Sequence, residues 1–118
     1  VGGQYLVRSI AKVNEDESLS FFCAIDEGSV LTIARRMDML ENLQEALAKV
    51  RATVGPPQLI LGCDCILRLL ESKRDGTQER IGKLLAENNV IGFATYGEQF
   101  NSMHVNQTFT GVAIGQPC

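Results

Sequence analysis

Residues 92–115, GFATYGEQFNSMHVNQTFTGVAIG, predict two strands joined by a polar connection. Aromatic and β-branched residues favour strands over 90–97 and 106–115. The connection, EQFNSMHV, is long for a hairpin loop and contains the single histidine of the chain. The stretch is therefore either a packed pair of strands or a binding site at the ends of the two strands, where the connection joins them.

The remaining sequence predicts four more strands and three helices. The strands are expected over 3–13, 19–25, 29–35 and 58–62, and the helices over 40–54, 63–74 and 78–89. Leucine and valine at spacings of three and four mark one apolar face of the first helix, with Asp38 as its cap. Asp64 and Thr77 are expected to cap the other two helices.

The order βββ-α-β-αα-ββ predicts an α+β fold: a mixed, mainly antiparallel sheet of about six strands with two to three helices on one face. Helix 40–54 is expected to form a parallel crossover from the third strand to the fourth. With 118 residues the chain is expected to form a single domain, 1–118.

Composition and charge exclude several classes of function. With a net charge of -3 the chain has no excess of basic residues to bind the phosphates of a nucleic acid, so we expect no nucleic-acid partner. The apolar runs are too short for a membrane helix, so we expect no membrane partner. The 4 cysteines lack the paired spacing of a zinc site, so no metal is expected. Unpaired cysteines are typical of a reducing compartment and favour a cytoplasmic protein.

Five residues of the opening stretch are candidates for ligand binding: Tyr96, Gly97, Glu98, His104 and Asn106. Gly97 allows a sharp bend or a close approach of a ligand to the backbone. The others supply a hydroxyl, a carboxylate, an imidazole and an amide, a set that suits an amino acid or another small polar ligand. The alternative is an ordered loop whose polar groups satisfy its own backbone.

Three further candidates lie elsewhere in the sequence. Cys63 stands at the expected start of a helix, where exposed amides bind anions and lower the pKa of a thiol. Cys63 or Cys65 could therefore be a nucleophile with His104 as its base, or both could simply be small buried residues. Arg8 and Arg68 could clamp a ligand carboxylate, or face outward into solvent.

Taken as a string, residues 92–115 resemble the C-terminal signature of the FIST family, in which a Gly-Phe-x-Thr-Tyr-Gly-Glu strand is followed by an Asn-Gln-Thr strand. The other segments fit in order. YLVRSI at 5–10 is similar to the opening strand with its arginine, and LSFFCAIDEGSVL at 19–31 to the following hairpin. LILGCDCILR at 59–68 resembles the cysteine-containing strand-to-helix segment.

The resemblance implies a sensory input domain of a signal-transduction protein, mostly bacterial, that binds a small molecule such as an amino acid. It implies no enzyme activity and no required cofactor. The expected partners are the N-terminal FIST part, absent from this chain, and a signalling output domain. One alternative is a haem-based nitric-oxide sensor, in which His104 would be the axial ligand. Others are a thiol-dependent enzyme and a protein-interaction module.

Overall fold

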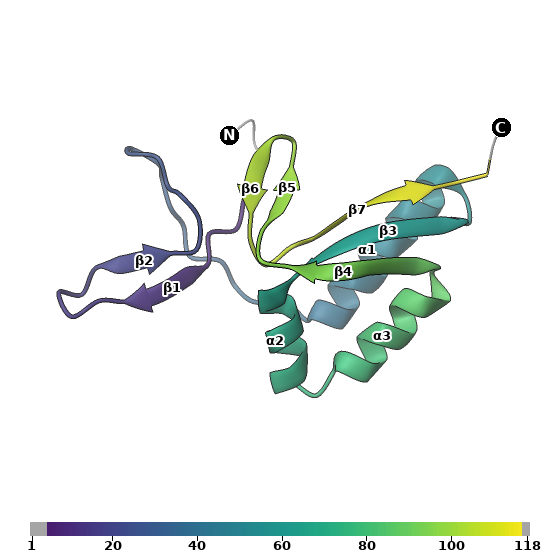
Figure 1. Ribbon diagram of the computed structural model, residues 1–118, viewed down its shortest axis with the longest axis horizontal. Helices are drawn as coiled ribbons and strands as arrows, with labels where there is room; N and C mark the ends of the chain where they lie inside the picture. The colour runs from purple at the N-terminus through teal and green to yellow at the C-terminus, as the bar shows by residue number, and fades with distance from the viewer. Residues whose placement is uncertain (1–4, 117–118) are drawn as a thin grey trace.

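The computed structural model describes residues 5–116 as a central sheet backed by helices, with a hairpin arm that extends to one side (Figure 1). The strands are β1 (Ile10–Val13), β2 (Leu19–Phe21), β3 (Leu59–Cys65), β4 (Val90–Thr95), β5 (Glu98–Phe100), β6 (Met103–Val105) and β7 (Phe109–Ile114). The helices are α1 (Met39–Val54), α2 (Ile66–Arg74) and α3 (Gln78–Glu87). None of these helices, within residues 5–116, has the length and apolar character needed to cross a membrane.

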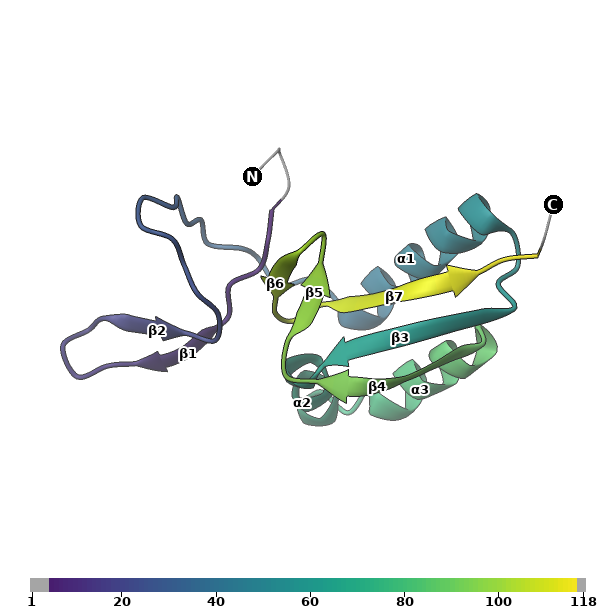
Figure 2. The ribbon, with the colours of Figure 1, turned by 45° about the horizontal axis from the view of Figure 1, so that its top comes forward.

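The central sheet has the order β4-β3-β7, with β3 parallel to β4 and antiparallel to β7. All three helices lie on the same side of it (Figure 2). The α+β class and the placement of the helices on one face are therefore as predicted. The opposite face of the sheet is bare in the described part of the chain.

Helix α1 forms where the sequence predicts it. The Asp38 carboxylate accepts a hydrogen bond from the Glu41 amide at 2.9 Å, and Gly55 ends the helix with a φ of 75°. The buried face of α1 packs with residues from β3 and α3 into one apolar core: Leu40, Leu43, Leu47, Ile60 and Ile81. This core fixes the helices against one face of the sheet.

The predicted boundary between β3 and α2 is wrong by three residues. Residues 63–65 continue the strand because they pair with β4 on one side, and residues 63 and 64 also pair with β7 on the other. The helix begins at Ile66, and its N-cap residue Cys65 makes no side-chain cap hydrogen bond. Asp64 is therefore not a helix cap, and Cys63 lies in a strand rather than at a helix start. Thr77 does occupy the N-cap position of α3, but also without a side-chain hydrogen bond.

The single six-stranded sheet is replaced by three separate sheets in the described residues: β1-β2, β4-β3-β7 and β5-β6. Residues 29–35 form no strand, so the predicted crossover through α1 does not exist. The parallel pair is instead β3 and β4, which α2 and α3 connect. The predicted loop at 98–105 contains the small hairpin β5-β6.

Residues 10–33 form an arm that stands apart from the central sheet (Figures 1 and 2). The arm contains the β1-β2 hairpin and the loop that follows it. The radius of gyration is 15.9 Å, whereas a compact chain of this length has about 13.5 Å. Two connecting segments, residues 5–9 and 34–37, form the base of the arm, and they pass beside α2 and the β5-β6 hairpin.

Candidate functional site

A cavity of about 360 Å³ lies between the base of the arm and the helices α1 and α2. Its lining combines guanidinium groups, one carboxylate, two amides and several apolar side chains. The lining residues are Val7, Ala34, Arg35, Arg36, Met37, Met39, Asn42, Arg68, Glu71 and Gln107. Such a volume suits a small ligand, and the mixture of charges suits a polar one.

Arg68 is the most buried charged residue in the cavity wall, with 8% of its surface exposed. Its Nε donates to Asp64 Oδ1 at 2.7 Å across the turn from β3 into α2. Within residues 5–116 no other hydrogen bond of the Arg68 side chain is found, so its terminal nitrogens remain available. A nearly buried guanidinium with free donors is suited to bidentate binding of a carboxylate, through two parallel hydrogen bonds.

Asp64 contacts Arg68 from a partly buried position that makes its own carboxyl harder to ionise. Burial raises the pKa of the Asp64 carboxyl, and the nearby charge of Glu98 raises it further. The charge and hydrogen bond of Arg68 oppose this effect but do not cancel it. The Asp64 carboxyl is therefore partly desolvated, and Arg68 is the group that stabilises its charged form.

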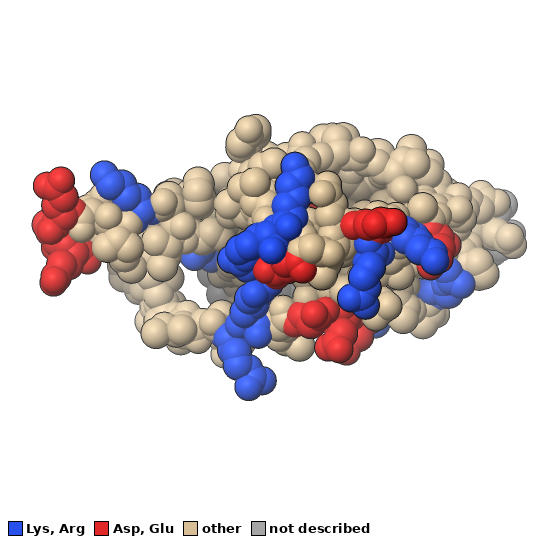
Figure 3. Space-filling view, turned by 90° about the horizontal axis from the view of Figure 1, so that it is seen from below, with Lys and Arg blue, Asp and Glu red and all other residues tan. Residues whose placement is uncertain are grey.

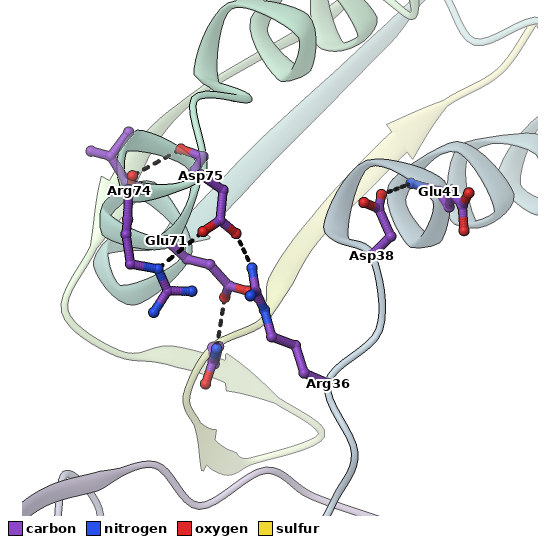
Figure 4. A network of polar contacts seen from close by, with 9 residues as sticks. Arg36, Asp38, Glu41, Glu71, Arg74 and Asp75 are labelled. Atoms are coloured by element: carbon purple, nitrogen blue, oxygen red, sulfur yellow. Dashed lines mark hydrogen bonds and ion pairs between the residues drawn. The ribbon is translucent and has the colours of Figure 1, made fainter.

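Glu71 on α2 joins the body of the protein to the base of the arm (Figure 4). Its Oε1 accepts from Arg36 Nε at 2.5 Å, and its Oε2 accepts from Gln107 Nε2 at 2.8 Å. Arg36 also contacts Asp75, which Arg74 contacts at 3.0 Å. Burial raises the pKa of Glu71, but the hydrogen bonds from Gln107 and Arg36, together with the arginine charges, outweigh it and lower that pKa overall.

This network predicts an acid-dependent loss of stability. A carboxyl whose folded-state pKa is lowered stabilises the fold above its unfolded pKa, here 4.5, and that contribution is lost as the pH falls through the folded-state value. We expect the melting temperature of Glu71→Gln to fall less between neutral pH and acid than that of the unchanged protein. Melting curves across this pH range test it, and parallel curves for the two proteins would contradict it.

Glu98 and Asn106 are interior residues, with 2% and 1% of their surfaces exposed. The Glu98 carboxylate accepts hydrogen bonds from the hydroxyls of Thr95 and Thr108, the latter at 2.9 Å. Asn106 Oδ1 is buried and has no partner among the described residues. Neither residue lines the cavity. Glu98 instead links Thr95 at the end of β4 to Thr108 just before β7.

Four further predicted site residues lie outside the cavity wall, and two of them, Arg8 and Gly97, are half-buried. Tyr96 is exposed, and so is His104. The ring of His104 lies so close to Gly97 that a side chain at 97 would collide with its Nε2 atom. Arg8 Nη1 donates to the carbonyl oxygen of His104 at 3.4 Å, which ties the base of the arm to β6. These contacts explain the glycine at position 97 by packing.

Cys63 lies on the bare face of the central sheet, between Phe93 and Thr110 on the neighbouring strands. Of the eight predicted site residues, only Arg68 therefore lines the cavity. The other polar wall residues were not predicted from the sequence: Arg35, Arg36, Asn42, Glu71 and Gln107. The signals available were the paired arginines before the α1 cap and Gln107 within the Asn-Gln-Thr motif. No group of three or more metal-ligating side chains occurs within residues 5–116.

A family comparison identifies the chain. The model of the FIST C domain matches residues 1–101, which is most of the 118 residues and includes the arm, the cavity helices and Glu98. The match ends before His104 and the Asn-Gln-Thr motif. Neither a search of curated proteins nor a search of solved structures gave a match. The match is consistent with a sensory domain of signal transduction, and the chain belongs to the FIST C domain family.

Proposed function

We propose that this domain binds a small carboxylate-containing ligand, such as an amino acid, in the cavity at the base of the arm. The observation that carries the proposal is Arg68, a nearly buried arginine in the cavity wall whose terminal nitrogens are unpaired within residues 5–116. The domain would act as a cytoplasmic sensory input for a bacterial signalling protein, together with an N-terminal FIST part and an output domain.

The chemistry of the lining matches both ends of an amino acid. Arg68 and the exposed Arg35 offer guanidinium groups to the ligand carboxylate. Glu71 is the carboxylate in the same wall and would receive the ammonium. Val7, Met37 and Met39 provide an apolar part of the wall for the ligand side chain. Binding without chemical conversion is the function that this set of groups supports.

The position of the cavity supplies a mechanism for signalling. One side of its wall belongs to the base of the arm, and the other to α1, α2 and Gln107. A ligand that contacts both sides favours the arm positions that bring these two sides together. It thereby shifts the population of arm positions by the difference between its affinities for them. The output partner would read that shift.

The test is a thermal-shift screen of the protein with the common amino acids. A ligand present at about 100 times its dissociation constant stabilises the native state by about 2.7 kcal/mol, so the melting temperature should rise by several degrees. Arg35→Ala removes a charged hydrogen-bond donor from the wall and should weaken binding about 10-fold or more.

The matched control for this screen is Arg80→Ala. Arg80 is an exposed arginine on α3 that does not line the cavity, so its removal should leave affinity unchanged. If the Arg35→Ala and Arg80→Ala variants bound the ligand with equal affinity, the ligand would not bind in this cavity. No response to any amino acid would rule out this class of ligand.

The haem alternative is not supported by the geometry around His104. This residue is exposed on β6 and does not line the cavity at the base of the arm. A haem needs a large apolar pocket beside its axial ligand. For the thiol alternative, Cys63 lies within β3 rather than at a helix start, and Cys65 at the N-cap of α2 is fully buried. Small-ligand binding therefore remains the better proposal.

A further inference from the structure

The wall of the cavity at the base of the arm is more basic than acidic. Arg35, Arg36 and Arg68 line it, whereas Glu71 is the only carboxylate among its lining residues within residues 5–116. Seen from below in Figure 3, Lys and Arg side chains gather around an acidic group near the middle of the molecule. A buried charge is costly unless it is paired, so a ligand that fills the cavity is favoured when it balances these charges.

Two of the three arginines are already paired with carboxylates. Arg68 Nε donates to Asp64 Oδ1 at 2.7 Å, and the terminal nitrogens of Arg68 have no hydrogen bond within residues 5–116. Arg36 contacts both Glu71 and Asp75, so its guanidinium bridges two acidic groups. Arg36 therefore holds the wall together, whereas Arg68 keeps two nitrogens for a ligand.

Arg35 is the arginine of the wall that forms no ion pair in the described part of the chain. The wall and the charged groups bonded to it comprise four arginines and three carboxylates, because Arg74 contacts Asp75. One positive charge is therefore unbalanced. A neutral amino acid is a zwitterion and would leave this charge unbalanced. Aspartate and glutamate carry one net negative charge and would balance it.

We propose that the ligand of this cavity is an acidic amino acid, aspartate or glutamate. The inference rests on the proposed function and narrows it to one class of amino acid. Arg68 binds the α-carboxylate, and Arg35 binds the side-chain carboxylate. Glu71 binds the ammonium, because a carboxylate offers about four acceptor sites and the hydrogen bonds from Arg36 and Gln107 occupy two of them.

The different burial of the two arginines fits this division. Arg68 is 8% exposed and belongs to α2, so it suits the carboxylate that every amino acid has. Arg35 is exposed and belongs to the base of the arm, so it suits the end of the ligand that varies. An acidic amino acid thus places one carboxylate on α2 and the other on the base of the arm, whereas a neutral one places its only carboxylate on α2.

The test compares amino acids of nearly equal size that differ by one charge. Isothermal titration calorimetry of the protein with glutamate and glutamine, and with aspartate and asparagine, measures the affinity for each. The acidic member of each pair should bind about 10-fold more tightly, the lower end for a contact between charged groups because Arg35 is exposed. Added salt should reduce this preference, since it screens exposed charges. Glutarate, which lacks the ammonium, should bind more weakly than glutamate.

The variant Arg35→Gln assigns the preference to one residue. It should weaken the binding of glutamate about 10-fold and leave the binding of glutamine nearly unchanged, so that the two affinities become similar. Arg80→Gln is the matched control, because Arg80 is an exposed arginine on α3 outside the wall, and this variant should keep the preference for glutamate.

The outcomes separate the class of ligand from the existence of the site. Glutamine that binds as tightly as glutamate, or an Arg35→Gln variant that keeps the preference, would overturn the acidic class while the cavity remained the site of an amino acid. Glutarate that binds as tightly as glutamate would replace the amino acid by a plain dicarboxylate. Failure of glutamate and aspartate alone to bind would overturn this inference, whereas failure of every amino acid would overturn the proposed function as well.

Discussion

Replacing Arg68 by methionine should lower the free energy of unfolding by about 1–3 kcal/mol at neutral pH. The reason is Asp64, which would remain in its partly buried position after losing the guanidinium that contacts it at 2.7 Å. Its pKa is already raised by burial despite Arg68, and would rise further without it. Urea denaturation at equilibrium measures the loss.

The pH dependence identifies the cause of this loss. An aspartate with a raised folded-state pKa contributes stability that is complete below its unfolded pKa of 3.8 and disappears as the pH rises through the folded value. The deficit of Arg68→Met should therefore be small below 3.8 and full at neutral pH. Arg74→Met, at an exposed position of the same helix, should have little effect. A deficit that is equal at both pH values would show that lost packing, rather than the charge of Asp64, causes it.

The second large effect is expected for Gly92→Ala. At this position β3 and β4 approach so closely that a Cβ atom would lie 1.8 Å from the carbonyl oxygen of Gly62. The obstacle is backbone in the middle of the sheet, so it cannot move aside as a flexible side chain would. Overpacking of this kind costs about 1–3 kcal/mol, and we expect the upper end here.

Gly82→Ala is the matched control for this substitution. Gly82 lies in α3 with nothing within 4 Å of its would-be Cβ, so alanine should stabilise the helix by about 0.5–1 kcal/mol. The two variants make the same chemical change with opposite expected signs. Denaturation midpoints compare them directly, and a Gly92→Ala protein as stable as the wild type would mean that the two strands are farther apart than the structure shows.

Local signals in the sequence were sufficient for α1. Asp38 marks the start of α1, the leucine stripe marks its buried face, and Gly55 marks its end, so no distant part of the chain is needed to place this helix. Residues 29–35 show the opposite case. Their apolar, β-branched composition favours a strand, but a strand also needs a neighbour to pair with, and none lies beside them within residues 5–116. Composition does not reveal which partner is available.

The difference between local signals and contacts with distant parts of the chain also applies to the candidate site. Glu98, Asn106 and Arg68 were predicted as ligand-binding residues, and all three are buried in the structure. Their grouping was not predictable, because Arg68 lines the cavity from α2 while Glu98 and Asn106 do not line it. Arg35 and Glu71 come from segments far apart in the sequence, and only the folded position of the arm base brings them to one wall.

The central claim, a ligand site at the base of the arm, is tested most directly by titrating the ¹⁵N-labelled protein with the amino acid that gives the largest thermal shift and following its backbone amide signals. The account predicts saturable changes that begin with the cavity wall, at Arg35, Asn42, Arg68 and Gln107, and extend into the arm. Changes confined to the sheet face around Phe93, or no changes at all, would contradict it.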